Sequence, residues 1–165
     1  MNLLNYIEQK LNRPDLGLLV LRVVFGLVIF IFGIQKLMGG GAMFEQIGGA
    51  LAMFGITWQP KLWGLLCALT ETFGGLAIIL GVFFRPAALL LIGNMIVATV
   101  ANAKMTGAVD TSSVMAFAEW LGKVAIPVYY LGAFVALFFT GPGKYAVSKG
   151  GGGGGGGRSG GKSRE

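Results

Sequence analysis

Four long apolar segments limit this chain to folds that satisfy their backbone hydrogen bonds inside lipid. The segments run over residues 16–38, 62–83, 86–103 and 124–140. A helix needs about 20 mostly apolar residues to cross about 30 Å of hydrocarbon. Because lipid offers the backbone no hydrogen-bond partner, only helices and closed barrels span a membrane, and segments of this length favour helices. We therefore predict an all-α fold, a four-helix transmembrane bundle.

The composition agrees with lipid as the main solvent. Hydrophobic residues make up 55% of the 165 residues and charged residues only 12%, about half the charged fraction of a typical soluble domain. The chain has no histidine and one cysteine, Cys67. Imidazole ligation of haem, zinc or copper is therefore excluded, and Cys67 has no partner for an internal disulfide or a Cys-x-x-Cys pair. We expect no metal site and no intrinsic cofactor.

Two flanking regions complete the predicted organisation around a transmembrane domain over residues 16–146. Residues 1–15 carry an apolar stripe at helical spacing and are interpreted as an interfacial segment. Residues 147–165 form a glycine-rich basic tail that cannot bury a core, so we expect it to be disordered. Much of the net charge of +6 belongs to this tail, and we expect no nucleic-acid partner.

The two longer loops also carry helical patterns. An apolar stripe over residues 43–54 predicts a short interfacial helix in the first loop. In the second loop, the run from Asp110 to Ser113 offers an N-cap for a helix that passes through Trp120. This helix can continue into the fourth span, with Pro127 as a kink or an early helical residue.

The distribution of basic residues predicts the orientation in the membrane. Lysine and arginine gather in the N-terminal segment, in the turn around Arg85 and in the C-terminal segment, whereas the two longer loops are less basic. Trp58, Trp63 and Trp120 all fall at the opposite interface, where aromatic belts form. Because basic segments stay on the cytoplasmic side, we expect both termini to be cytoplasmic.

Polar side chains inside the spans are the candidates for function. On insertion scales a charged residue near the centre of a span costs about 2.5–3.5 kcal/mol, so it persists when it is paired or functional. Helical spacing places each candidate on a face rich in small residues, which let membrane helices approach closely. We therefore expect these faces to meet at the centre of the bundle. They contain Arg22 and Lys36 with Gly26 and Gly33; Glu71 with Gly64, Ala68 and Gly75; Asn94 with Ala87, Ala98 and Ala101; and Tyr129 with Ala133, Ala136 and Thr140.

Depth suggests which of these side chains meet. At about 1.5 Å per residue, Arg22 lies roughly 9 Å, Asn94 roughly 12 Å and Glu71 roughly 16 Å from the inner surface. We expect Arg22 to pair with Glu71, with Asn94 and Tyr129 completing the hydrogen bonds. Lys36 lies near the outer boundary, where it either snorkels to the interface or turns inward.

Two interpretations of this polar cluster stay open. The cluster either fixes the register of the helices or forms a site that binds a ligand or handles protons or electrons. Cys67 lies one turn from Glu71 on the edge of the same face, and a small packing residue is favoured there over a redox group.

The order and spacing of several motifs resemble the DoxX family of membrane proteins over residues 16–146. In the first span these are Arg22-x3-Gly26-x3-Phe30-x2-Gly33-x2-Lys36-Leu37. They are followed by Glu71-x2-Gly74-Gly75, by Gly81 before Arg85-Pro86-Ala87-Ala88, and by Gly141-Pro142-Gly143. The resemblance implies a four-helix protein of the bacterial inner membrane.

The resemblance also implies a link to redox physiology. DoxX-type relatives are connected with thiosulfate:quinone oxidoreductases, with complexes of superoxide dismutase and a sulfurtransferase, and with resistance to quinone or thiol stress. By analogy the chain is expected to be a membrane subunit of a quinone-linked redox or oxidative-stress system. Arg22 and Lys36 would hold quinone oxygens or an anionic substrate, and Glu71 would exchange protons.

Because the chain has no built-in redox centre, oxidoreductase activity would require a diffusible quinone or a soluble or membrane partner protein. Two alternatives remain. One is a membrane scaffold that tethers soluble redox enzymes, and the other is a small proton-coupled permease.

Overall fold

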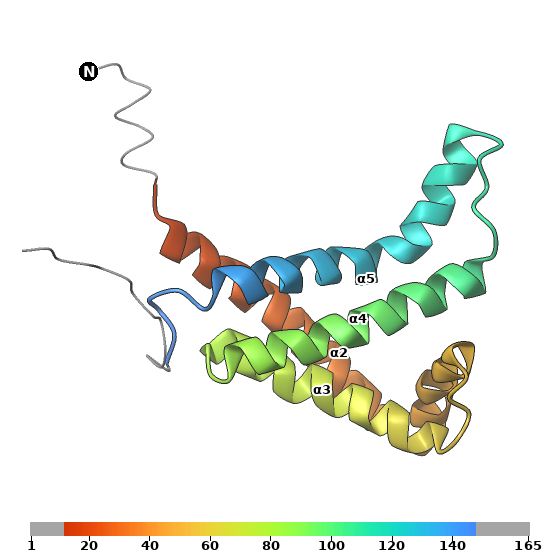
Figure 1. Cartoon of the computed structure of the whole chain (residues 1–165), viewed down its shortest axis with the longest axis horizontal. Helices are drawn as coiled ribbons and strands as arrows, with labels where there is room; N and C mark the ends of the chain where they lie inside the picture. The colour runs from red at the N-terminus through yellow and green to blue at the C-terminus, as the bar shows by residue number, and fades with distance from the viewer. Residues whose placement is uncertain (1–11, 148–165) are drawn as a thin grey trace, which may run out of the picture.

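The computed structural model describes residues 12–147 and contains only helical elements within that range (Figure 1). Four helices are long and apolar enough to cross a membrane, which confirms the predicted all-α four-helix fold and a multi-pass membrane protein. Most of the predicted interfacial segment 1–15 and of the glycine-rich tail 147–165 lies outside the described residues. The elements are α2 (Pro14–Gly48), η1 (Gly49–Phe54), α3 (Pro60–Leu80), α4 (Phe84–Thr106) and α5 (Val114–Thr140).

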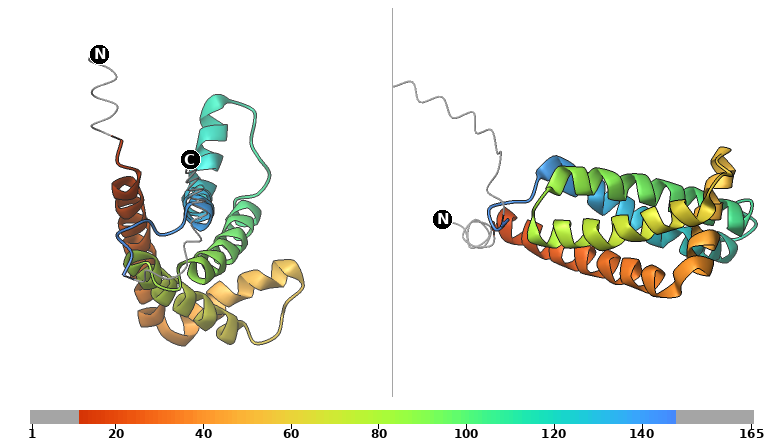
Figure 2. Two further views of the ribbon diagram at one scale, coloured as in Figure 1. Left: turned by 60° about the vertical axis from the view of Figure 1, so that its left-hand side comes forward. Right: turned by 90° about the horizontal axis from the view of Figure 1, so that it is seen from below.

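The four long helices run up and down along the bundle in the order of the sequence (Figures 1 and 2). The described chain begins and ends at one end of the bundle, which we call the terminal end. The turn between α3 and α4 also lies there, and the two longer connections lie at the other end, the loop end. All three tryptophans belong to elements at the loop end, opposite Arg13, Arg85 and Lys144.

Local signals explain where the helices begin and end. Pro14 and Pro60 open α2 and α3, where the missing N–H of proline is not needed. The Ser113 hydroxyl accepts a hydrogen bond from the Ala116 N–H at 3.1 Å and caps α5. From there α5 runs unbroken to Thr140 with Pro127 inside it, so the predicted loop helix and the fourth span form one helix.

The helix α2 is longer than the predicted first span because it continues past residue 38 to Gly48. It is broken at Gly40, whose φ of 64° and ψ of −155° are conformations that a residue with a side chain rarely adopts. The break turns the last part of α2 and η1 across the start of α3 at the loop end (Figure 2). This part forms one side of the cavity described below.

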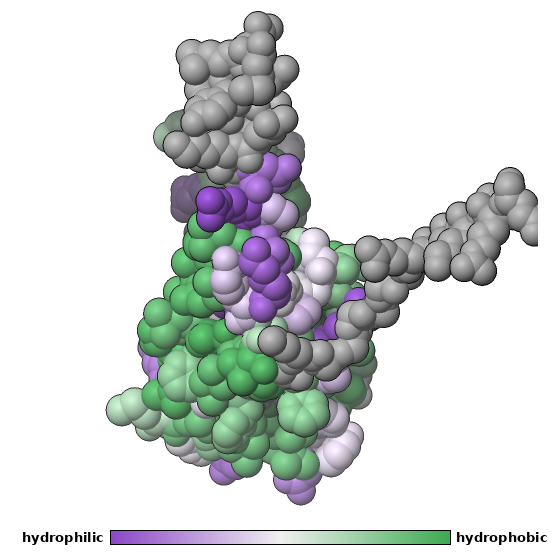
Figure 3. Space-filling model, turned by 90° about the vertical axis from the view of Figure 1, so that its left-hand side faces the viewer, coloured by the Kyte–Doolittle hydropathy of each residue, from purple (hydrophilic) through white to green (hydrophobic). Residues whose placement is uncertain are grey.

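The large apolar side chains divide between a compact core and a surface that suits lipid. Ile29, Ile78, Leu91, Phe134 and Leu137 are fully buried between the helices. Many other large apolar side chains point outward along the lengths of all four helices. Seen from the terminal end, hydrophobic residues cover the sides of the bundle, and hydrophilic residues gather where the described chain begins and ends (Figure 3). This distribution is expected when hydrocarbon surrounds the helices.

The helices α2 and α3 make the closest contact in the bundle through small residues. A Cβ atom added at Gly26 would lie 3.0 Å from the Gly75 carbonyl oxygen, and one at Gly33 would lie 2.5 Å from the Thr72 backbone nitrogen. A side chain at Gly33 would require the two backbones to separate, and one at Gly26 would require Ile79 and the Gly75 carbonyl to shift. The small-residue faces predicted for the first two spans therefore do meet, and they set the register between α2 and α3.

This contact predicts that Gly33→Ala separates α2 from α3 and destabilises the bundle by about 1–3 kcal/mol, the usual cost of overpacking. Gly132→Ala in α5 is the matched control, because a Cβ atom at Gly132 meets nothing within 4 Å. That control should be neutral or should gain up to about 1 kcal/mol of helix propensity. Thermal unfolding of both variants in the same detergent provides the measurement. Equal melting temperatures would contradict the assigned register.

Candidate functional site

A buried ion pair between Lys36 and Glu71 forms the centre of the candidate site. The Lys36 ammonium donates to Glu71 Oε1, and Asn94 Nδ2 donates to the same oxygen at 3.0 Å. The Glu71 side chain is 2% exposed and that of Lys36 is 25% exposed. The helices α2, α3 and α4 each contribute one of these residues. We call Lys36, Glu71 and Asn94 the polar cluster.

The thiol of Cys67 adjoins this cluster. Its Sγ atom lies 3.8 Å from Lys36 Nζ and 3.9 Å from Glu71 Oε1, within range of weak hydrogen bonds to sulfur. Cys67 precedes Glu71 by one turn of α3, so both side chains lie on the same side of that helix. A thiol, an ammonium, a carboxylate and an amide are thus in mutual contact.

The prediction that Arg22 pairs with Glu71 is wrong. The α2–α3 contact places Gly33 beside the Glu71 backbone, with a distance of 2.9 Å from a Cβ atom at Gly33 to the Glu71 carbonyl carbon. Arg22 precedes Gly33 by about three helical turns, which separates it from Glu71 by roughly 16 Å along the bundle. Lys36, one turn beyond Gly33, occupies the position that reaches the carboxylate.

Arg22 instead holds the segment that follows α5, residues 141–147, which we call the C-terminal strap. Its Nη1 atom donates to the Pro142 carbonyl at 2.6 Å, and its Nη2 atom donates to the Tyr145 carbonyl. The strap also contacts α3, because the Val147 N–H donates to the Leu80 carbonyl at 2.9 Å. Arg22, only 2% exposed, therefore anchors the C-terminal strap to α2 at the terminal end.

The local electrostatics explain why Arg22 is stable without a carboxylate partner. The helices α3 and α5 both end at this level, at Leu80 and Thr140. Helix C-termini carry partial negative charge on their free carbonyl groups. Gly81 leaves room for the guanidinium, since a Cβ atom there would lie 2.8 Å from Arg22 Nη1.

Tyr129 does not belong to the site, which corrects a second prediction. Its side chain is 65% exposed, and Ala136 and Thr140 on the same stripe are exposed as well. The opposite stripe faces inward, and the Tyr130 ring packs edge-on against Phe25 at 5.2 Å. The helices α2 and α5 are spaced so that aromatic side chains fill the gap, and the face of α5 with small residues therefore turns outward.

A cavity of about 220 Å³ lies between α3 and α4 next to the polar cluster, with residues of η1 and the end of α2 on one side. Cys67 and Asn94 line it, and Trp63 and Thr70 extend its lining along α3. Two buried polar atoms beside these groups have no hydrogen-bond partner among the described residues, Trp63 Nε1 and Glu71 Oε2. The cavity therefore combines apolar walls with a few hydrogen-bonding groups, as small-molecule sites usually do.

Sequence reasoning assigned Trp63 only to the interfacial belt and missed its place in the cavity. The signal that identifies it is helical spacing, because Trp63, Cys67 and Thr70 follow one another at single turns along α3. The cavity also depends on the η1 segment, whose fold across α3 was not predicted.

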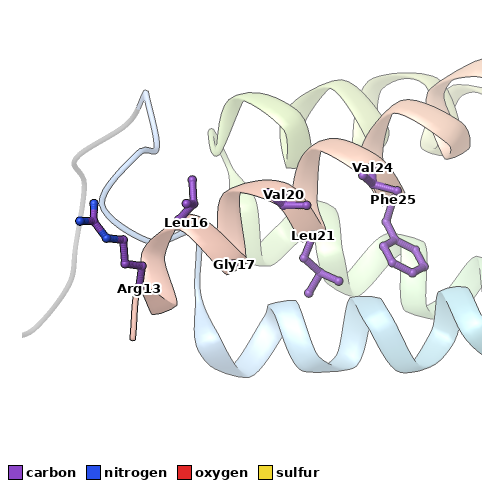
Figure 4. Close-up of a pocket in the computed structure, with 7 residues that line it drawn as sticks. All are labelled: Arg13, Leu16, Gly17, Val20, Leu21, Val24 and Phe25. Carbon is purple, nitrogen blue, oxygen red and sulfur yellow. The ribbon is translucent and has the colours of Figure 1, made fainter. Parts of the chain in front are cut away.

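A larger groove of about 620 Å³ runs along the first half of α2 (Figure 4). The seven lining residues all belong to α2 or directly precede it, and Leu21 and Phe25 point toward α5 (Figure 4). Arg13 is the only charged residue in this lining. The groove is an apolar surface facing lipid, and size alone does not make it a site. We therefore place the candidate site at the smaller cavity, where the hydrogen-bonding groups converge.

The polar cluster contains groups that can hydrogen-bond an organic ligand. Across residues 12–147, no three potential ligands among histidine, cysteine, aspartate and glutamate lie together. The polar cluster instead offers donors to a ligand oxygen and a carboxylate–ammonium pair through which a proton can move.

The four long apolar helices define a multi-pass α-helical membrane protein, and the polar cluster lies between three of them, α2, α3 and α4. The chain belongs to the DoxX family, whose family model matches residues 17–104. This range contains the polar cluster, Cys67 and Trp63. The resemblance predicted from the motifs is thus confirmed.

Among characterised sequences, the chain is similar to the inner membrane protein YphA of Escherichia coli K12. The two are 31% identical over 152 residues, which cover 90% of this chain and 99% of the relative. No solved structure matches the chain.

The geometry predicts strong coupling between Lys36 and Glu71. Lys36→Met alone should destabilise the bundle by about 3 kcal/mol, because it leaves the buried Glu71 charge without its partner. Glu71→Gln alone should cost less, because the partly exposed Lys36 can turn toward the interface. The double variant should be less destabilised than the sum of the two changes. A double-mutant cycle of unfolding free energies provides the measurement, with the exposed pair Lys61–Glu45 as a control expected to contribute less than about 1 kcal/mol. Strict additivity would show that the Lys36 and Glu71 side chains do not interact.

A separate prediction concerns the hydrogen bonds between Arg22 and the C-terminal strap. Arg22→Met should release the C-terminal strap and expose the bond after Lys144 to trypsin, with cleavage at least severalfold faster than in the wild type. Arg85→Met is the matched control, because Arg85 is exposed at the same end. Mass spectrometry distinguishes cleavage at Lys144 from cleavage further along the tail. Unchanged cleavage after Lys144 in Arg22→Met would show that the arginine does not hold the strap.

Proposed function

We propose that this protein is a membrane subunit of a quinone-linked redox or oxidative-stress system, and that the cavity beside the polar cluster binds the quinone head group. The observation that carries this proposal is that Asn94, which lines the cavity, donates to the Glu71 carboxylate, and that Glu71 is paired with Lys36 behind the cavity wall. Buried ionisable groups in membrane proteins are costly, and they commonly mark ligand or proton pathways. Trp63 lines the same cavity, and its buried Nε1 has no hydrogen-bond partner among residues 12–147.

Asn94, Lys36 and Glu71 have different roles in this proposal. Asn94, already bonded to Glu71 Oε1, connects the cavity to the carboxylate. Lys36 keeps negative charge on Glu71 tolerable inside lipid, and the second oxygen of Glu71 is free to take up a proton. A quinone supplies two-electron chemistry when bound, and the chain supplies its orientation, a proton and an environment that excludes water.

The cellular location forms part of the same proposal. The name of the E. coli relative places that protein in the inner membrane, and we assign the same membrane to this chain. Arg13, Arg85 and Lys144 lie at the terminal end of the bundle, and the tryptophans lie at the loop end. Because Lys61, Lys104 and Lys123 lie at the loop end, the support for an orientation with both termini in the cytoplasm comes from the tryptophans and from the further basic residues that the sequence carries before residue 12 and after residue 147.

The single cysteine allows a direct test of ligand binding. Bound decylubiquinone should slow the alkylation of Cys67 by N-ethylmaleimide in protein reconstituted into nanodiscs, as measured by intact mass spectrometry. Its fully substituted ring has no open position for addition of the thiol. Asn94→Leu should weaken this protection by roughly tenfold, because a buried hydrogen-bonding group is lost. The matched control is Asn102→Leu at the loop end of α4, which should protect like the wild type.

A cellular assay connects binding to function. Glu71→Gln keeps nearly the same volume but loses the charge and the exchangeable proton. This variant should insert and fold yet fail to restore quinone resistance to a strain that lacks the gene, with folded amount and resistance measured on the same cells. Full resistance with Glu71→Gln, or no protection of Cys67 in the wild type, would contradict the proposal. The first result would favour a scaffold that tethers redox enzymes.

A further inference from the structure

The cavity has a hydrogen-bond donor at its loop end that the rest of the structure does not use. Trp63 Nε1 is buried and has no partner among residues 12–147, although its indole lines the cavity. Trp120, in contrast, donates its Nε1–H to the Gly107 carbonyl at 3.1 Å. A tryptophan that served only as an interfacial anchor would direct its N–H toward water or head groups. The buried N–H of Trp63 therefore lacks the partner that a buried donor normally has.

The wall of the cavity also shows where a ligand can enter. Leu66 from α3 and Leu90 from α4 line the cavity and are 43% and 61% exposed. Gly93 belongs to the same lining, and a Cβ atom there would meet nothing within 4 Å. Exposed apolar side chains on membrane helices face hydrocarbon. This edge of the cavity is therefore apolar, and it is the side on which an opening toward lipid would lie.

The hydrogen-bonding groups lie deeper than this opening and at separate places along the cavity. Trp63 stands about one turn of α3 nearer the loop end than Cys67, and Thr70 stands one turn on the other side. Asn94 connects the inner wall to Glu71. The charged Lys36 is not part of the lining and lies behind the carboxylate. This arrangement suits an uncharged head group with oxygens on its edge, and it offers nothing at the opening to a water-soluble anion.

We propose that a lipid-soluble ligand enters this cavity sideways from the bilayer between α3 and α4, past Gly93, and that Trp63 Nε1 donates a hydrogen bond to an oxygen of its head group. The apolar tail stays between Leu66 and Leu90 in contact with lipid. This inference rests on the proposed function and adds the class of ligand, its route of entry and the residue that orients it.

Two substitutions test the donor and the route separately, with decylubiquinone as the probe and protection of Cys67 as the measurement. Trp63→Phe keeps an aromatic ring but removes the donor, so the affinity for decylubiquinone should fall about five- to tenfold. Trp120→Phe, which changes a tryptophan outside the cavity, should leave the affinity unchanged.

Gly93→Leu fills open space at the entrance and should slow the onset of protection at least fivefold. Gly132→Leu, at an open position on α5, should leave the onset unchanged.

The outcomes separate this inference from the proposed function. If decylubiquinone protects Cys67 in the wild type but Trp63→Phe binds with unchanged affinity, Trp63 is not the donor and the inference is overturned. Unchanged onset in a folded Gly93→Leu variant overturns the lateral route. In both cases the proposed quinone site stands. Absence of protection in the wild type overturns the proposed site and this inference together. Circular dichroism and size-exclusion profiles of each variant establish that it is folded.

Discussion

The close contact between α2 and α3 determines most of what is distinctive in this structure. Gly26 and Gly33 on one helix meet Gly75 and Thr72 on the other at distances that leave no room for a side chain. In lipid the hydrophobic effect does not drive helices together, so this kind of backbone approach supplies much of the association. The same contact fixes the register, and the register decides which charges meet.

Two cations on one face of α2, the buried Arg22 and the partly buried Lys36, therefore have separate roles. Lys36 reaches Glu71 near the loop-end half of the bundle, where Cys67 and Asn94 join them beside the cavity. Arg22 is held at the terminal end by carbonyl groups of the C-terminal strap. A guanidinium suits that place because its fixed fork of donors matches two carbonyls at once. An ammonium suits the ion pair with Glu71, because it is a compact charge that can exchange a proton.

The cavity is closed on one side by the segment that folds over the loop end. The break at Gly40 turns the end of α2 and η1 across α3, and residues of both line the cavity beside Trp63. Gly93 belongs to this lining, and a Cβ atom there would meet nothing within 4 Å. Trp63 near the loop end, the ion pair behind Asn94 and the exposed apolar residues of the lining are the features from which we propose a site for an amphipathic molecule. This is the physical basis of both the proposed function and the inferred route of entry.

The sequence by itself determined the number of long helices and the inward faces of the first three spans, and it named Lys36, Glu71 and Asn94 among its candidates. The reason is that a span must be long and apolar to cross lipid, so the length of an apolar segment predicts a helix. A polar residue inside such a segment is costly, and it therefore indicates the face that turns away from lipid. The sequence also placed a helix start in the run from Asp110 to Ser113 but left open whether that helix continues into the fourth span, which the structure shows that it does. Only the tertiary structure decided that Lys36 rather than Arg22 reaches Glu71, that Tyr129 faces outward and that Trp63 lines a cavity. Those outcomes depend on the relative axial shift of neighbouring helices and on the distance between α2 and α5. Helical periodicity gives the direction of a side chain around its own helix, whereas the shift between two helices follows from the pairing of their small residues in space.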